Sequence, residues 1–327
     1  MLRALLIASG ISESELRAIG RRHNDAGLTA AEAMRAKPGS RSLPLSEVGE
    51  LFARLREARG PVLKTEILTG VLKEMPAPPA GNLIRNLTGH LRIGLKEGLL
   101  EDAIAAAFER EIVAVREAHM LLGDIGQVAL LARQNRLEDA ELTLFQPVRC
   151  MLASPEPDST AVWQRQGAAG TVWLEDKLDG IRAQVHCALD RVEIFSRDLR
   201  RITESFPEIA LAARNLGRTV VFDGEILAWE AGRALPFLEL QKRLGRREPD
   251  LFLGGEIPVA YVIFDVLLFD EASLLKRPLA ERRQLLVTLR LQEPLLRSKV
   301  EPAGNAAAIE KAFAAARERG NEGLLAK

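Results

Sequence analysis

The sequence predicts a multidomain chain in which an all-α first part is followed by an α+β second part. Helical periodicity with capping residues continues from residue 1 to about residue 145 and then stops. A proline-rich stretch follows at 154–157, so we place the boundary at 145/146. Beyond it, strand-like runs alternate with helical segments, which is typical of an α+β fold rather than a doubly wound sheet.

The composition is that of a globular protein. Of 327 residues, 47% are hydrophobic and 28% charged, and Lys+Arg and Asp+Glu both number 45. With a net charge of zero, any nucleic-acid surface must be a local patch. The two cysteines and four histidines show no zinc spacing. The apolar run at 1–7 is too short for a signal peptide or a membrane span, so we expect an intracellular, cytoplasmic protein without membrane association.

In the first part, helix starts are predicted by capping boxes at 12–15 and 29–32 and by Ser46, and a loop is predicted at 76–81. The most informative segment is 89–98, which combines Arg92 and Lys96 with Gly94 and Gly98. Glycines at helix junctions expose backbone N–H groups, which together with nearby cations form a phosphate-binding corner. The alternative is that these glycines only end helices and that the charges are solvated.

In the second part, strand-like runs are predicted at 171–177, 182–188, 191–196, 219–228 and 258–269, and helices at 203–215, 235–244 and 305–319. Lys177 ends the first of these strands, and Asp179-Gly180 forms the turn into the next. It is the only lysine between Lys96 and Lys242. Because a lysine can lose its proton, it can act as a nucleophile, which an arginine cannot. The alternative is a surface hairpin with solvated charges.

Three further runs carry polar groups in apolar surroundings: Asp223 and Glu225 within 220–227, Asp265 within 261–267, and Glu322 within 321–327. Carboxylates at such places are costly unless they bind a cation or hydrogen-bond donors. Glu322 and Lys327 are five residues apart, which places them on opposite faces of a regular strand, so a twist or bulge is needed to bring both to one ligand. Each acid alone could also be an ordinary sheet-edge residue.

Taken in order, the segments 177–182, 195–197, 222–225, 261–265 and 322–327 resemble the motifs of the covalent nucleotidyltransferases, specifically of ATP-dependent DNA ligases. The segments 91–98 and 120–124 resemble the helical DNA-binding domain of the multidomain ligases. The resemblance implies a DNA-binding domain over 1–145 and an ATP-grasp-like adenylation (nucleotidyltransferase) domain over 146–327.

The resemblance also implies roles for single residues. Lys177 would attack the α-phosphate of ATP and carry AMP as a phosphoramidate, before AMP passes to the 5′-phosphate of a nick and the 3′-hydroxyl displaces it. Glu175 would read the adenine, Phe264 would stack on it, and Lys327 would approach the α-phosphate. The remaining expected ligands are Arg182 for the ribose or nick end, Arg197 for nick phosphate, and Glu225 and Glu322 for the ribose or a divalent metal, Mg²⁺ or Mn²⁺.

The expected partner is nicked double-stranded DNA, bound by a monomer during replication, repair or recombination. Arg92, Gly94, Lys96 and Gly98 are the expected DNA contacts. Two basic clusters, Arg54, Arg56, Arg59 and Lys64 in the first part and Lys242, Arg243, Arg246 and Arg247 in the second, are either further contacts or solvated helix faces.

The chain departs from the family pattern at both ends. The family continues with a further lysine-rich motif and an oligonucleotide-binding (OB) barrel, so we expect the barrel to be absent, the chain to be truncated at both ends, and its activity to be weak. Two alternatives stay open: an RNA ligase or capping-type guanylyltransferase with the same lysine chemistry, and a non-catalytic DNA-binding remnant.

Overall fold

The computed structural model describes residues 1–91, 94–245 and 257–327. It contains two compact units, Met1–Lys96 and Glu97–Lys327. The helices that follow Lys96 pack in the same compact unit as the sheets. The predicted boundary at 145/146 divides family domains rather than compact units, and it stays a prediction. Within the described ranges, no helix is long and apolar enough to cross a membrane.

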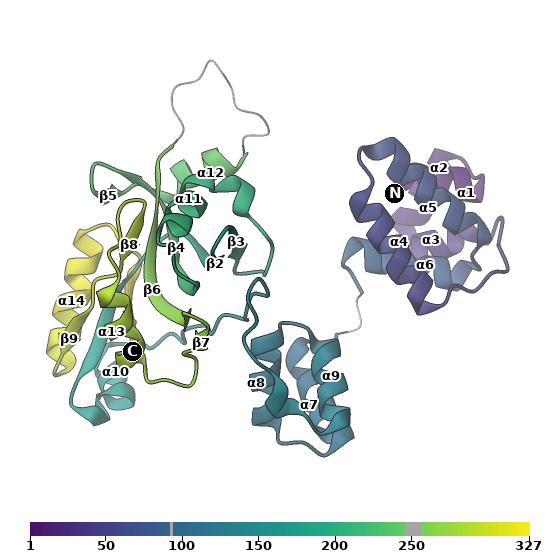
Figure 1. The fold of residues 1–327 in the computed structure, drawn as a ribbon. Helices are drawn as coiled ribbons and strands as arrows, with labels where there is room; N and C mark the ends of the chain where they lie inside the picture. Colours follow the sequence, from purple (N-terminus) through teal and green to yellow (C-terminus); the bar gives the residue numbers. More distant parts are fainter. Residues whose placement is uncertain (92–93, 246–256) are drawn as a thin grey trace. The chain divides into compact units, whose positions relative to one another are not determined.

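The first unit is built of helices α1 to α6 (Figure 1). Their bounds are α1 Leu2–Ser9, α2 Glu13–His23, α3 Ala26–Met34, α4 Leu45–Glu57, α5 Pro61–Glu74 and α6 Ala77–Thr88. The core between them is closed by fully buried side chains, of which the largest are Leu16, Met34, Leu72 and Ile84.

The helix starts in this unit show which capping predictions were right. Ser12 caps α2, because its side chain accepts a hydrogen bond from the backbone N–H of Glu15. The predicted start at Thr29 is wrong, since α3 already begins after Asp25, whose side chain accepts from Leu28 N–H. The loop predicted at 76–81 is also wrong. Pro76 is the N-cap of α6, and Pro78 and Pro79 lie in its first turn, where a missing N–H costs no hydrogen bond.

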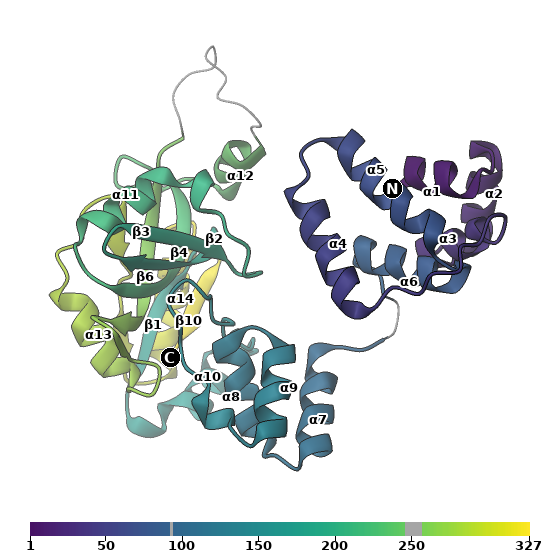
Figure 2. The ribbon, with the colours of Figure 1, turned by 45° about the vertical axis from the view of Figure 1, so that its right-hand side comes forward.

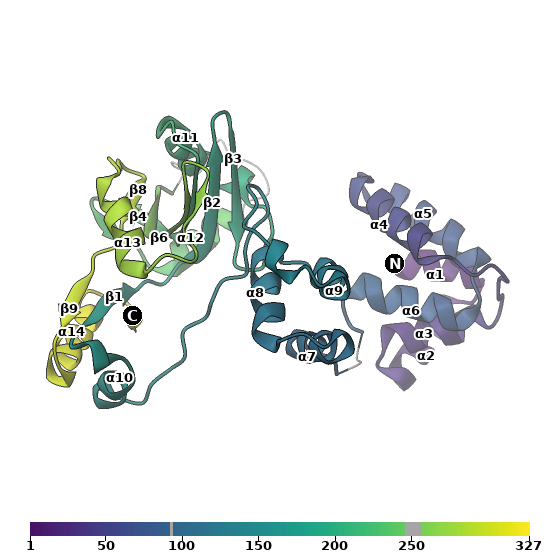
Figure 3. The ribbon, with the colours of Figure 1, turned by 60° about the horizontal axis from the view of Figure 1, so that its bottom comes forward.

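The second unit begins with three short helices, α7 Glu97–Phe108, α8 Ile112–Leu122 and α9 Ile125–Gln134, and the 3₁₀ turn η1 Leu137–Asp139. They enclose a small core of their own. An extended segment then leads to α10 Ser159–Gln166 and the 3₁₀ turn η2 Gly167–Ala169 (Figure 3).

Two sheets follow. The small antiparallel sheet has the order β10-β1-β9, with β1 Val172–Lys177, β9 Glu301–Ala303 and β10 Gly323–Ala326. The helices α10 and α14 (Ala306–Glu318) pack on one of its faces, where Val172, Leu174 and Ile309 are buried.

The large sheet has the order β3-β2-β4-β6-β7 (Figure 2). Its strands are β2 Ile181–Ala188, β3 Arg191–Ser196, β4 Val220–Glu230, β6 Val259–Phe269 and β7 Ala272–Ser273; β5 Arg233–Ala234 pairs with β4, and β8 Leu295–Arg297 runs parallel to β6. The associated helical segments are η3 Thr203–Ser205, α11 Pro207–Asn215, α12 Phe237–Gly245 and α13 Leu279–Thr288.

The α+β prediction for this part is confirmed, and the five long strand predictions agree with the structure to within two residues at each end. The hairpin alternative at Lys177 is wrong, because β1 and β2 belong to different sheets. Gly180 allows this crossing between sheets. A Cβ there would lie 2.3 Å from the carbonyl oxygen of Ile226, so only glycine lets the turn pass this close to β4.

Candidate active site

Lys177 is the last residue of β1, and its side chain is about half exposed (49%). Its Nζ forms an ion pair with the carboxylate of Glu322. The backbone N–H of Glu322 also donates to the carbonyl oxygen of Lys177, at 3.0 Å. Glu322 precedes β10, so strand alternation does not govern its direction. This placement removes the need for the twist or bulge that the sequence predicted.

Glu175 lies two residues before Lys177 on the same face of β1, and it is only 4% exposed. Its Oε1 accepts a hydrogen bond from Lys327 Nζ at 3.0 Å. The same Nζ lies 5.0 Å from the centre of the Phe264 ring, so the ammonium group also makes a cation–π contact. The structure therefore brings Glu175, Phe264 and Lys327 together at one end of the site.

Arg182 connects this end of the site to the large sheet. Its guanidinium donates to both carboxylate oxygens of Asp223, at 3.2 and 2.7 Å, and to the carbonyl oxygen of Met151 at 2.7 Å. It also lies 5.5 Å from the centre of the Phe264 ring. Burial raises the pKa of Asp223, and the Arg182 guanidinium opposes that shift. The two side chains form a partly buried ion pair that holds Arg182 in one orientation.

Glu225 pairs across the strands with Arg182 in the β2–β4 register. Burial raises the pKa of Glu225 to about 7, while Arg182 opposes the shift and the neighbouring Asp223 adds to it. The Glu225 side chain makes no hydrogen bond within the described part of the chain. A half-buried carboxylate without a hydrogen-bond donor is one that a cation would stabilise.

The residues present fit a divalent metal only as part of a larger ligand set. Glu225 and Glu322 both face the Lys177 end of the site, but no group of three or more metal-ligating side chains occurs in the ranges the structure describes. Mg²⁺ is commonly bound by one or two carboxylates together with substrate phosphates, and two protein carboxylates satisfy that pattern.

Arg197 lies in a separate groove with a volume of about 390 Å³. The groove is lined by Glu97, Arg149, Cys150, Leu152, Arg197, Asp198 and Leu199. Arg197 is exposed and forms no ion pair with another described residue. Cys150 lines the groove, and burial raises the pKa of its thiol. Both Arg182 of the main site and Arg197 of the groove lower that pKa electrostatically, so the thiol lies within reach of both guanidinium groups.

Sequence reasoning missed the two polar side chains of β2 that hold the segment before Cys150. His186 Nδ1 accepts from the backbone N–H of Phe145 at 3.1 Å, and Gln184 Oε1 accepts from that of Val148 at 3.0 Å. Both side chains are buried. Burial lowers the pKa of His186 to about 4, so it accepts as the neutral ring. The available signal was the pair of polar residues, two apart, among the otherwise apolar residues 183–188 of the strand.

The predicted DNA contacts are only partly described. Arg92 lies outside the described residues, as do Arg246 and Arg247 of the second basic cluster. Gly94, Lys96 and Gly98 are exposed, with Gly94 at a φ of +67° and Gly98 in the first turn of α7. Their contact with DNA stays a prediction.

For Arg243, the reading as part of a solvated helix face is wrong. Its guanidinium is only 12% exposed and donates to both carboxylate oxygens of Glu208, at 2.6 and 2.8 Å. It also donates to the carbonyl oxygens of Ser205 and Ile257. The side chain was misjudged because its carboxylate partner lies 35 positions earlier in the sequence.

With this geometry established, comparison with known proteins decides the family. A model of the ATP dependent DNA ligase domain matches residues 150–327, more than half of the chain. This chain belongs to the ATP-dependent DNA ligase family. A second model, of the DNA ligase N terminus, matches residues 1–105. The resemblance stated from the sequence motifs is thus confirmed.

Relatives within this ligase family cover most of the chain. A probable DNA ligase of Koribacter versatilis is 40% identical over 98% of this chain and 59% of its own length. One of Opitutus terrae is 43% identical over 89% of this chain and 35% of its own length. The chain thus spans between about a third and three fifths of these relatives. The solved structure Pmar-Lig_Pre matches all of this chain and 73% of its own with a TM-score of 0.54 at 16% identity, which shows a shared fold.

Proposed function

We propose that this chain supplies the nucleotidyl-transfer chemistry of an ATP-dependent DNA ligase that seals nicks in duplex DNA, with Lys177 as the nucleophile. The observation that carries the proposal is the position of Lys177. It ends β1 two residues after the buried Glu175, is paired with the Glu322 carboxylate and acts electrostatically on that of Glu225. Such an arrangement provides a contact for the base at one end and charged groups for phosphate at the other.

In the first step, Lys177 Nζ forms a bond to the α-phosphorus of ATP while the bond to pyrophosphate breaks. The attacking amine must be neutral, so its proton leaves before or during attack. The Glu322 carboxylate, paired with Nζ, holds the amine at the strand end and offers an acceptor for that proton. Phosphoryl transfer depends mostly on positioning and charge neutralisation, which this cluster of charged groups supports.

The adenine is assigned to the end of the site formed by Glu175, Phe264 and Lys327. The Glu175 carboxylate is an acceptor suited to the amino group of the base, and the half-buried Phe264 ring offers a stacking surface. Lys327 contacts both side chains. For Lys327 to approach the α-phosphate, as the family resemblance implies, its ammonium group has to leave this end of the site.

Glu225 and Glu322 would hold Mg²⁺ or Mn²⁺ together with phosphate oxygens. The metal, when bound, neutralises charge on the transferring phosphate. Loading the site would also keep Glu225 ionised at neutral pH, where burial otherwise leaves it partly protonated.

In the later steps AMP passes to the 5′-phosphate of the nick, and the 3′-hydroxyl displaces it. Arg182, held by Asp223, is assigned to the ribose or the nick end, and Arg197 to phosphate in its groove. Arg92, Gly94, Lys96 and Gly98 are assigned to the DNA backbone, which suits an enzyme that must tolerate any sequence. The protein is proposed to act as a monomer inside the cell, on DNA under replication, repair or recombination.

The test is the intact mass of the purified chain after incubation with ATP and Mg²⁺. An AMP adduct is expected with ATP, and Lys177→Ala should abolish it. Lys311→Ala, an exposed lysine of α14, serves as the matched control and should be adenylated like the wild type. Parallel incubations with GTP and NAD test the choice of nucleotide.

The other outcomes decide between the remaining functions. A GMP adduct in place of AMP would favour a capping-type enzyme, and sealing of nicked RNA but not DNA would favour an RNA ligase. Failure both to form an adduct and to seal a nick that already carries AMP would refute the proposal and leave a DNA-binding role.

A further inference from the structure

The residue between Glu175 and Lys177 points away from both. Because side chains alternate along a strand, Asp176 lies on the opposite face of β1, with Val172 and Leu174, toward α14. There its carboxylate accepts two hydrogen bonds from Arg319, at 3.1 and 2.6 Å, and one from Asn321 Nδ2 at 2.9 Å. Arg319 is the C-cap of α14, and Asn321 lies in the segment between α14 and β10.

This segment presents Glu322 to Lys177. It is attached to β1 at two places, by Asp176 through its side chain and by Lys177 through its carbonyl oxygen, which accepts from Glu322 N–H. Arg317 adds a third restraint, since its guanidinium donates to the carbonyl oxygens of Asn321 and Glu322 at 3.2 and 3.1 Å. The strands β1 and β10 and the helix α14 lie together in Figure 2.

We propose that Asp176, Arg319 and Asn321 act as a positioning clamp, which sets the Glu322 carboxylate against the Lys177 amine and thereby controls the rate of lysine adenylation. None of the three touches the Lys177 amine, so they are positioning residues and not catalytic ones. The inference rests on the proposed function, because it concerns the rate of the same reaction.

The exposure of the Asp176–Arg319 pair makes a positioning role distinguishable from a merely structural one. The side chains of Asp176 and Arg319 are 28% and 46% exposed, and ion pairs as exposed as this one contribute little to folding stability. A displacement of a reacting group by about 1 Å, in contrast, can slow a reaction by about a hundredfold. Loss of the clamp should therefore affect the rate far more than the stability.

The experiment measures the rate of AMP adduct formation by intact mass, at saturating ATP and Mg²⁺, on full chains first treated with pyrophosphate to remove AMP already bound. Asp176→Ala and Arg319→Ala should each react about tenfold more slowly than the wild type or worse. Their melting temperatures should stay within about 3 °C of it. Arg319→Lys, which keeps the charge and one donor, should recover part of the rate.

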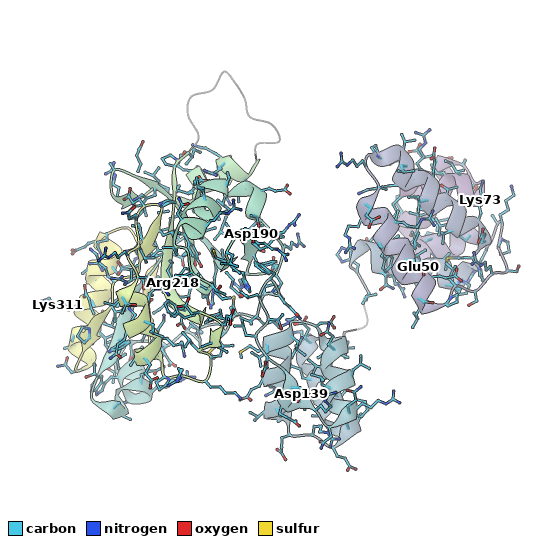
Figure 4. The ribbon with its side chains drawn as sticks, viewed as in Figure 1. Glu50, Lys73, Asp139, Asp190, Arg218 and Lys311 are labelled. Atoms are coloured by element: carbon cyan, nitrogen blue, oxygen red, sulfur yellow. The ribbon has the colours of Figure 1, made fainter. Side chains whose placement is uncertain are left out.

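Arg218→Ala is the matched control. Arg218, labelled in Figure 4, forms a similarly exposed pair with Asp270 in the same compact unit, at 2.7 Å. Its loss should leave the adenylation rate unchanged. Asp176→Asn keeps the shape of the side chain and replaces Asp176→Ala if the alanine variant does not fold.

A double-mutant cycle tests whether the clamp acts through Glu322. In a Glu322→Gln background, Asp176→Ala should cause no further loss of rate, because the carboxylate that it positions is gone. A wild-type rate in Asp176→Ala, or an equal loss in both backgrounds, would overturn the clamp alone. A wild-type chain that forms no adduct would instead refute the proposed function, and the clamp with it.

Discussion

Acidification is expected to destabilise the second unit through His186. Its ring is buried, and its Nδ1 accepts a hydrogen bond from Phe145 N–H, which requires the neutral form. Burial lowers the pKa of His186 from 6.5 to about 4. A base whose pKa is lowered by folding binds a proton more readily in the unfolded chain. Its neutral form therefore contributes fully above pH 6.5, and the contribution is lost as the pH falls from 6.5 toward 4.

The size of the effect follows from the shift. Each pKa unit corresponds to about 1.4 kcal/mol, so the difference between 6.5 and about 4 lowers the free energy of unfolding by about 3 kcal/mol. The matched variant is His186→Asn, which offers an amide oxygen near the position of Nδ1 but does not titrate.

The assay is urea unfolding followed by tryptophan fluorescence between pH 7 and pH 4. Trp163, Trp173 and Trp229, the three tryptophans of the chain, all lie in the second unit, so the signal reports on that unit alone. The wild type should lose about 3 kcal/mol more than His186→Asn over this range. Parallel stability curves for the two proteins would refute the reasoning.

Three further predictions concern the site and its support. Arg182→Ala should lower the free energy of unfolding by about 3 kcal/mol at pH 7, because it leaves the buried Asp223 without its partner, and urea unfolding should show a smaller loss for Asp223→Asn; equal small losses would contradict the ion pair. Glu225→Gln should raise the free energy of unfolding by up to about 3 kcal/mol at pH 8, where a half-buried carboxyl with a pKa of about 7 is ionised, and the gain should vanish near pH 4.5; a gain that did not depend on pH would argue against the raised pKa. Gly224→Ala should cost about 1–3 kcal/mol in the same assay, because its Cβ would lie 2.6 Å from both the buried Tyr261 ring and the carbonyl oxygen of Val262, and unchanged stability would contradict this close approach of β4 and β6.

Local patterns were sufficient for much of the fold. Alternation and helical periodicity depend on neighbours a few residues apart, so the long strands and the start of α2 at Ser12 were correctly predicted. Short elements such as β8 and β9 were missed, because three residues show no period and their strands are defined only by a partner. Thr29 and the prolines at 76–79 carried valid local signals, but the structure does not follow them. Asp25 caps α3 before Thr29 is reached, and the prolines lie at the start of α6 rather than in a loop.

The pattern of residues singled out Lys177 and Glu225, and the resemblance to the ligase motifs added Glu175 and Phe264 as members of the same site. The pairs among them depend on strand register and sheet crossing, which are long-range. Glu322 reaches Lys177 across 145 positions, Lys327 reaches Glu175 across 152, and Asp176 meets Arg319 across 143. Residue types and their order were therefore readable from the chain, whereas contacts, burial and the resulting pKa shifts arose only when distant strands were packed together.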